Sequence, residues 1–198
     1  MSEILLNARR VATLEVVPDR TARRVLAVAV FVALTTLGAY ATVPVPGSQV
    51  PVTLQTLFVS LAGVLLGARL GATAMATYVL IGFMGAPVFS NGFGGPGVLL
   101  GPTGGYLLAF PLAAAVTGLL APRAAAISLR ATLQLLAAIF IGTLVVLAGG
   151  FSQLSLLLGD SAQAFALGVA PFLIGDVVKT LLALLIARRL RNRTLGLL

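Results

Sequence analysis

Residues 25–43 read VLAVAVFVALTTLGAYATV, without a single charged side chain. This run opens a longer charge-free stretch between Arg24 and Arg69, and a second one follows between Arg69 and Arg123. A helix needs about 20 mainly apolar residues to cross the ~30 Å hydrocarbon core of a bilayer. Each stretch has room for two such helices joined by a turn. The sequence therefore predicts an all-α integral membrane protein.

The composition of the whole chain favours the same class. Of its 198 residues, 59% are hydrophobic and 9% charged, and the mean hydropathy is +1.10. A soluble domain has about 45–50% apolar and about 25% charged residues, so an ordinary soluble enzyme is excluded. The chain has no cysteine and no histidine, which excludes disulfides, thiolate or imidazole metal sites and His-dependent catalytic centres. We expect no enzyme activity, no metal site and no cofactor.

The apolar stretches divide into six predicted transmembrane helices. A tail exposed to water precedes the first helix, and another follows the last. We place the helices at about 25–43, 53–67, 70–85, 104–120, 131–150 and 165–187. The corresponding domains are an N-terminal tail at 1–24, a transmembrane substrate-binding domain at 25–187 and a basic C-terminal tail at 188–198.

The arginines predict the orientation of these helices. All twelve lie in the two tails, at the turn around Arg69 and in the loop from Arg123 to Arg130, whereas the loops at 44–52, 86–103 and 151–164 contain no arginine or lysine. Positive charge concentrates on the cytoplasmic side of membrane proteins. Both termini are therefore predicted to be cytoplasmic. The net charge of +8 then reflects topology in a lipid bilayer, and we expect no nucleic-acid partner.

Two charged residues lie in the middle of the last predicted span. Asp176 and Lys179 are three residues apart, so they share one face of a helix. A charge at the centre of a bilayer costs roughly 2.5–3.5 kcal/mol on insertion scales and usually marks a substrate or ion pathway. The pair could serve as a purely structural ion pair, as a proton relay, or as an acceptor and a donor for a small ligand.

The uncharged loops at 44–52 and 86–103 are rich in glycine and proline yet apolar, which is typical of backbone that lines a buried cavity. Candidate ligand contacts in or near them are the amides of Asn91 and Gln55 and the aromatic rings of Tyr78, Phe89 and Tyr106. The first span also carries Ala29 and Ala33, a small-xxx-small pattern that favours docking against another membrane helix.

Several strings taken together resemble the BioY family, the biotin-specific substrate-binding subunits (S components) of energy-coupling factor (ECF) vitamin transporters. They are VPVTLQTL at 50–57, LAGVLLGARLG at 61–71, GAPVF at 85–89, GFGGPGVLLGPTGGY at 92–106 and GDVVK at 175–179. The resemblance implies a six-helix S-component bundle in the cytoplasmic (inner) membrane of a bacterium or archaeon. It also implies that Asp176, Lys179 and Asn91 contact biotin.

The resemblance further implies a partner, a transmembrane coupling protein joined to two ATPases, which docks on the face of Ala29 and Ala33. Biotin has a ureido ring with two N–H donors, an apolar thiophane ring and a valerate carboxylate. Our hypothesis from the sequence is that Asp176 accepts from the ureido N–H groups while Lys179 pairs with the carboxylate. The alternatives are an S component for another vitamin, such as riboflavin or thiamin, a proton-coupled small-molecule carrier, and a ligand-free membrane scaffold.

Overall fold

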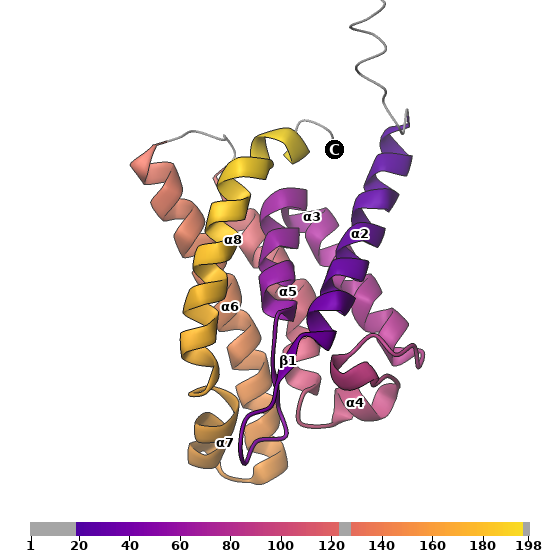
Figure 1. Ribbon diagram of the computed structural model, residues 1–198, viewed down its shortest axis with the longest axis vertical. Coiled ribbons are helices and arrows are strands. Elements are labelled where there is room, and N and C mark those ends of the chain that lie inside the picture. Colours follow the sequence, from indigo (N-terminus) through magenta and orange to yellow (C-terminus); the bar gives the residue numbers. More distant parts are fainter. Residues whose placement is uncertain (1–18, 123–127, 196–198) are drawn as a thin grey trace, which may run out of the picture.

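The computed structural model describes residues 19–122 and 128–195, which form a bundle of long helices (Figure 1). In chain order the elements are α2 (Arg20–Tyr40), β1 (Thr42–Val43), β2 (Val52–Thr53), α3 (Gln55–Phe83), the 3₁₀ turn η1 (Ser90–Gly92), α4 (Pro96–Leu100), α5 (Gly104–Leu120), α6 (Leu129–Leu158), α7 (Ser161–Gly168) and α8 (Phe172–Leu195). The predicted all-α class is confirmed.

Two ends of the bundle differ in structure. The start of α2 and the end of α8 lie at one end, while the β1–β2 hairpin, α4 and α7 lie at the other, which we call the hairpin end (Figure 1). The hairpin is antiparallel, with Thr42 opposite Thr53. It stays short because the three prolines of its loop cannot donate to a ladder. Ser48 at its tip donates to the Leu167 carbonyl, 2.9 Å away, and so ties the hairpin to α7.

The chain folds back on itself within α3. Gly67 adopts φ 80° and ψ 174°, a conformation that favours glycine, and interrupts the helical backbone. A Cβ built on Gly71 would lie 2.8 Å from the carbonyl oxygen of Ala62. Nine residues of straight helix would separate these positions by about 13.5 Å, so the two halves of α3 must lie against each other. The fold-back falls where the sequence predicted the boundary between two spans.

By length and hydropathy alone, three of the described helices could cross a membrane, namely α2, α3 and α6, where α3 is counted as one helix although it folds back at Gly67. A fourth span is counted if the bent pair α7 and α8 is taken as one. The apolar helix α5 covers the predicted residues 104–120 completely. With 17 residues, it is shorter than the three helices that could cross a membrane. These helices support a membrane protein, while the count of six spans and the cytoplasmic placement of the termini stay predictions.

Two boundaries near the C-terminus were predicted wrongly. The expected loop at 151–164 is mostly helix, because α6 continues to Leu158 and α7 begins at Ser161. The expected continuous span at 165–187 is broken after Gly168, and α7 and α8 differ in direction by 47°. Pro171 explains the break, since proline disfavours helical backbone in the residue before it and cannot donate to a helix that continues through it.

Helix ends also extend into both predicted tails. The helix α2 begins at Arg20, where the Asp19 carboxylate caps it by accepting from the Thr21 amide at 3.2 Å. The helix α8 continues through Leu195. The rest of the predicted N-terminal tail and the last three residues lie outside the described residues.

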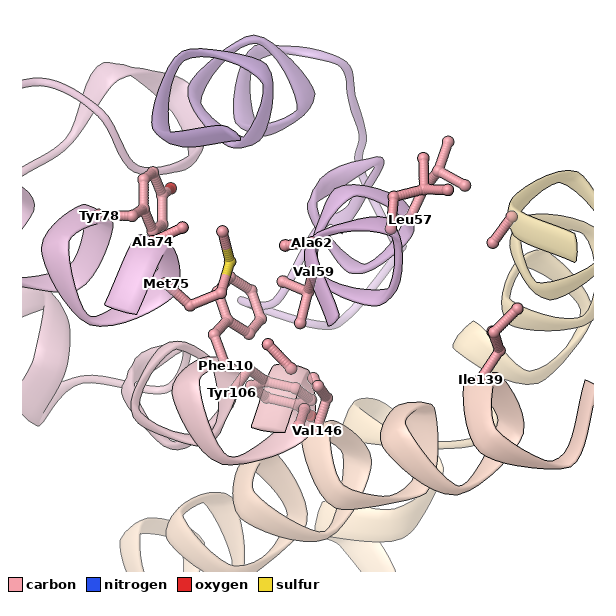
Figure 2. Close-up of a cluster of buried hydrophobic side chains, with 14 of the residues drawn as sticks. Leu57, Val59, Ala62, Ala74, Met75, Tyr78, Tyr106, Phe110, Ile139 and Val146 are labelled. Atoms are coloured by element: carbon pink, nitrogen blue, oxygen red, sulfur yellow. The ribbon is translucent and has the colours of Figure 1, made fainter. Parts of the chain in front are cut away.

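The core lies between both halves of α3, α5 and α6. Figure 2 shows Val59 and Met75, from the two halves of α3, close to Phe110 of α5. All three side chains are at most 2% exposed. The aromatic ring of Phe110 stacks against Tyr78, with ring centroids 6.3 Å apart. This packing fixes the framework from which the polar residues of the site project.

Candidate functional site

The charged pair of α8 is buried and joined to the start of α3. Asp176 is 5% and Lys179 6% exposed, and the ammonium lies 2.5 Å from Asp176 Oδ1. The same ammonium donates to the Thr53 carbonyl at 3.2 Å and to Thr56 Oγ1 at 2.7 Å. Lys179 therefore donates hydrogen bonds to two oxygens of the segment around the start of α3, and its charge is paired with Asp176.

Asp176 differs from Lys179 in having unused hydrogen-bonding capacity. Its Oδ1 is buried but accepts no hydrogen bond of regular geometry among the described residues, despite the nearby ammonium. A carboxylate has about four acceptor positions. The ion pair with Lys179 occupies part of this capacity, so the carboxylate can still receive N–H or O–H groups from a ligand.

A cavity of about 50 Å³, which we call the chamber, adjoins the pair. Four of the predicted ligand contacts line it together, Gln55, Tyr106, Asp176 and Lys179. Its other polar lining residues, which the sequence did not single out, are Thr53, Thr56, Ser90 and Thr103. The remainder of the lining is apolar: Val50, Pro51, Leu107, Phe110, Val146, Leu147 and Phe172. The chamber therefore combines one carboxylate–ammonium pair with hydroxyls, an amide and an apolar wall.

Tyr78 and Phe89 lie behind this wall and do not line the chamber. Gln55 Nε2 donates to Tyr78 Oη at 2.7 Å, and the tyrosine hydroxyl donates in turn to the Val88 carbonyl at 2.8 Å. The Phe89 ring packs edge-on against Tyr78, with centroids 5.6 Å apart, and covers Gly82. These two aromatic residues hold the Gln55 amide and the segment after α3 in place.

Asn91 lies in a second cavity, of about 220 Å³, which we call the vestibule. The residue has φ 58°, a left-handed conformation that asparagine tolerates, and its Oδ1 accepts from Thr42 Oγ1 at 3.3 Å. The vestibule lies at the hairpin end and is lined by the hairpin tip, η1, α4 and the turn that precedes α5. Three residues line both cavities, Pro51, Ser90 and Thr103.

Tyr106 contributes to the chamber wall and also fixes the break before α8. Its hydroxyl donates to the Gly168 carbonyl at 2.5 Å, and its ring lies 6.0 Å from that of Phe172. A Cβ on Gly150 of α6 would collide with the tyrosine ring. The string GPTGGY therefore places an aromatic ring between α6 and the start of α8.

Gln153 is a site-supporting residue that the sequence reading missed. Its Nε2 donates to the carbonyls of Leu99 and Gly101, at 2.9 and 2.7 Å, and so fixes the turn that carries Thr103. Nothing in the sequence separates this glutamine from other polar residues near the end of a span, since its partners are backbone groups from a distant segment.

The predicted docking residues lie on the face of α2 that points away from the helix bundle. Ala29 and Ala33 are exposed, whereas Phe31 and Thr35 of the same helix are buried against the bundle. An alanine face of this kind leaves room for close approach of another helix. Its use for docking stays a prediction.

No cluster of three or more potential metal-ligating side chains occurs within residues 19–122 and 128–195. The chain as a whole contains no cysteine and no histidine. The site can bind a ligand by hydrogen bonding and charge pairing through Asp176, Lys179 and neutral polar groups.

Comparison with known proteins gives consistent matches over nearly the whole chain. The sequence model of the BioY family matches residues 9–195. A probable biotin transporter BioY of Pyrococcus horikoshii is 41% identical over 87% of this chain and 99% of its own length. The biotin transporter BioY of Thermotoga maritima is also 41% identical, over 86% of this chain and 96% of its own length.

A solved structure has the same fold. The crystal structure of an S-component for biotin from an ECF-type ABC transporter superposes with a TM-score of 0.78, covering 88% of this chain and 94% of that one at 23% sequence identity. At this identity the likeness concerns the arrangement of the helices.

Proposed function

Because the chain belongs to the BioY family, we propose that it binds biotin from the outer side of the cytoplasmic membrane and takes part in its transport into the cell. The observation that carries the proposal is the buried Asp176–Lys179 pair on the wall of the chamber. Relatives named as biotin transporters match this chain over nearly their whole length, which supports the same ligand.

The chemistry of the site suits biotin. The apolar lining of the chamber matches the thiophane ring, and the unused acceptor capacity of Asp176 matches the ureido N–H groups. Charge-assisted hydrogen bonds of this kind are roughly twice as strong as neutral ones. Neither riboflavin nor thiamin shares this combination of a small donor-bearing ring and a flexible carboxylate tail.

The chain acts, in this proposal, as the S component of an energy-coupling factor transporter. It is not an enzyme and needs no cofactor, because ATP hydrolysis takes place on two partner ATPases linked through a transmembrane coupling protein. That protein docks on the exposed face of Ala29 and Ala33. Replacing both alanines by leucine should leave biotin binding unchanged but abolish ATP-driven uptake by the assembled transporter.

Equilibrium binding of labelled biotin to the purified, detergent-solubilised protein tests the proposal. Saturable binding of about one biotin per chain, displaced by unlabelled biotin but not by riboflavin or thiamin, is the expected result. Displacement by one of the other vitamins would keep the S-component role and change the ligand. A folded sample that binds no biotin would instead favour the proton-coupled carrier, whose transport an uncoupler should abolish.

A further inference from the structure

An apolar groove of about 500 Å³ runs along the bundle between α6 and α8. It shares Asp176 and Leu147 with the lining of the chamber. Its polar lining residues are Asp176, Thr143 and Thr180, which are all buried, and the rest of its lining is apolar. We propose that this groove binds an anionic phospholipid, with an acyl chain in the groove and the headgroup at arginines beyond one end of it.

The groove is long enough to hold an acyl chain of one leaflet. Its lining on α6 extends from Leu133 to Leu147, which corresponds to about 21 Å of helix. Half of the hydrocarbon core of a bilayer is about 15 Å thick. Leu133 is 55% exposed and Val177, on the opposite wall, is 57% exposed, so the groove is open to the surroundings of the bundle. An acyl chain that fills it supplies the dispersion contacts that these side chains lack when the space is empty.

The walls of the groove favour a flexible chain over another helix. Helices that approach each other closely in a membrane usually do so through small residues. The groove is lined mainly by leucines, together with Phe140, and Ala137 is its one alanine. This lining differs from the face of Ala29 and Ala33 on α2, where small side chains leave room for a helix.

Arginines lie beyond one end of the groove. On α6, Arg130 precedes Leu133 by three residues, and on α8, Arg188 follows Leu181 by seven. Both spacings place the arginine on the groove side of its helix. Both arginines are exposed, and α6 begins where α8 ends, at the same end of the bundle (Figure 1).

The charge of this end selects the headgroup. The distribution of arginines along the chain predicts that this end faces the cytoplasm. The cytoplasmic leaflet is rich in anionic lipids, and basic pockets between membrane helices on that side bind their headgroups. A phosphate held by Arg130 and Arg188 leaves its acyl chain at the entrance of the groove.

Lipid binding to the purified protein in detergent tests the headgroup contact. Native mass spectrometry compares phosphatidylglycerol with phosphatidylcholine of identical acyl chains. The unmodified protein should retain one phosphatidylglycerol with a preference of more than about tenfold, because each arginine near an anionic headgroup contributes about fivefold. Arg130→Gln and Arg188→Gln should each lower this preference about fivefold. Arg69→Gln, which removes an equal charge from an exposed position beside the fold-back of α3, is the matched control and should change it less than about twofold.

Filling the groove tests the position of the acyl chain. Ala137 lines the groove and is exposed, so Ala137→Phe places a ring in the space without entering the core. This variant should lose the retained phosphatidylglycerol. Ala76→Phe, which adds the same ring at an exposed position of α3 outside the groove, should keep it. Cooperative thermal unfolding of both variants in the same detergent checks that they are folded.

Three results would overturn the proposal. One is equal retention of the two lipids by the unmodified protein, and another is an equal effect of Arg69→Gln and Arg188→Gln. The third is a crosslink to protein rather than to lipid, in membranes, from a photoreactive residue in place of Ala137, which would assign the groove to a second copy of this chain or to a partner helix. None of these measurements involves biotin, so their failure leaves the proposed function untouched.

Discussion

The α3–α5 pair and the α6–α8 pair both line the chamber. The two helices of the first pair are in close backbone contact, whereas those of the second pair are separated by a groove. Between α3 and α5, a Cβ built on Gly63 would lie 2.5 Å from the Ala114 carbonyl oxygen. Between α6 and α8 there is instead an apolar groove of about 500 Å³. Asp176 lines both this groove and the chamber.

The difference assigns separate tasks to the two pairs. The close contact of α3 with α5 gives Gln55 and Tyr106 fixed positions on one side of the chamber. The charged pair comes from α8, which has unfilled space on its α6 side and is hydrogen-bonded through Lys179 to Thr53 and Thr56. We therefore expect substitutions to affect folding most in the first pair and ligand binding most at the chamber itself.

The largest effect is expected for Gly63→Ala. The added methyl group would overlap the backbone oxygen of Ala114, which cannot move away without displacing α5. Overpacking of this kind costs about 1–3 kcal/mol of the free energy of unfolding, so the thermal midpoint in detergent should fall by several degrees. Gly97→Ala is the control, because no atom lies within 4 Å of its Cβ position. Equal midpoints for the two variants would contradict the close contact of α3 with α5.

An intermediate effect is expected for Asp176→Asn, and it is measured on ligand binding. The change replaces the carboxylate by a neutral amide, so charge-assisted hydrogen bonds to the ligand are lost and biotin binding should weaken more than tenfold, or by about 1.4 kcal/mol. Asp160→Asn is the matched control, because Asp160 caps α7 outside the chamber and asparagine caps helices equally well. If Asp176→Asn, still folded, binds biotin as tightly as the unmodified protein, the assignment of the site is wrong.

The smallest effect is expected in the groove between α6 and α8. Ala137 lines the groove and is exposed, so Ala137→Leu should change the free energy of unfolding by less than about 0.5 kcal/mol. The neighbouring Ala138 is 1% exposed and faces the core, so Ala138→Leu should cost about 1–3 kcal/mol. Thermal unfolding of both variants in one detergent compares them. A similar loss for both would mean that α6 and α8 are closely packed in solution.

The charged residues of the site could be predicted from the sequence because they differ in polarity from the apolar residues around them. Asp176 and Lys179 stand out as charges in an apolar span, and the structure joins them on the chamber wall. Thr53, Thr56 and Gln153 do not stand out, because uncharged polar residues are common near the ends of spans. Tyr78 and Phe89 were predicted as ligand contacts but support the chamber from behind, since aromatic composition does not distinguish lining from packing.

The sequence by itself determined the membrane class, most of the helical segments and the two charged residues of the site. Hydropathy and charge act on each segment locally, through the cost of placing it in a bilayer, so they can be read along the chain. Tertiary structure alone decided that Tyr106 reaches Gly168, that Gln153 holds the turn before α5, and that two cavities share Ser90 and Thr103 in their walls. These features depend on contacts between residues far apart in the chain, and such contacts form only when the packed helices bring those residues together.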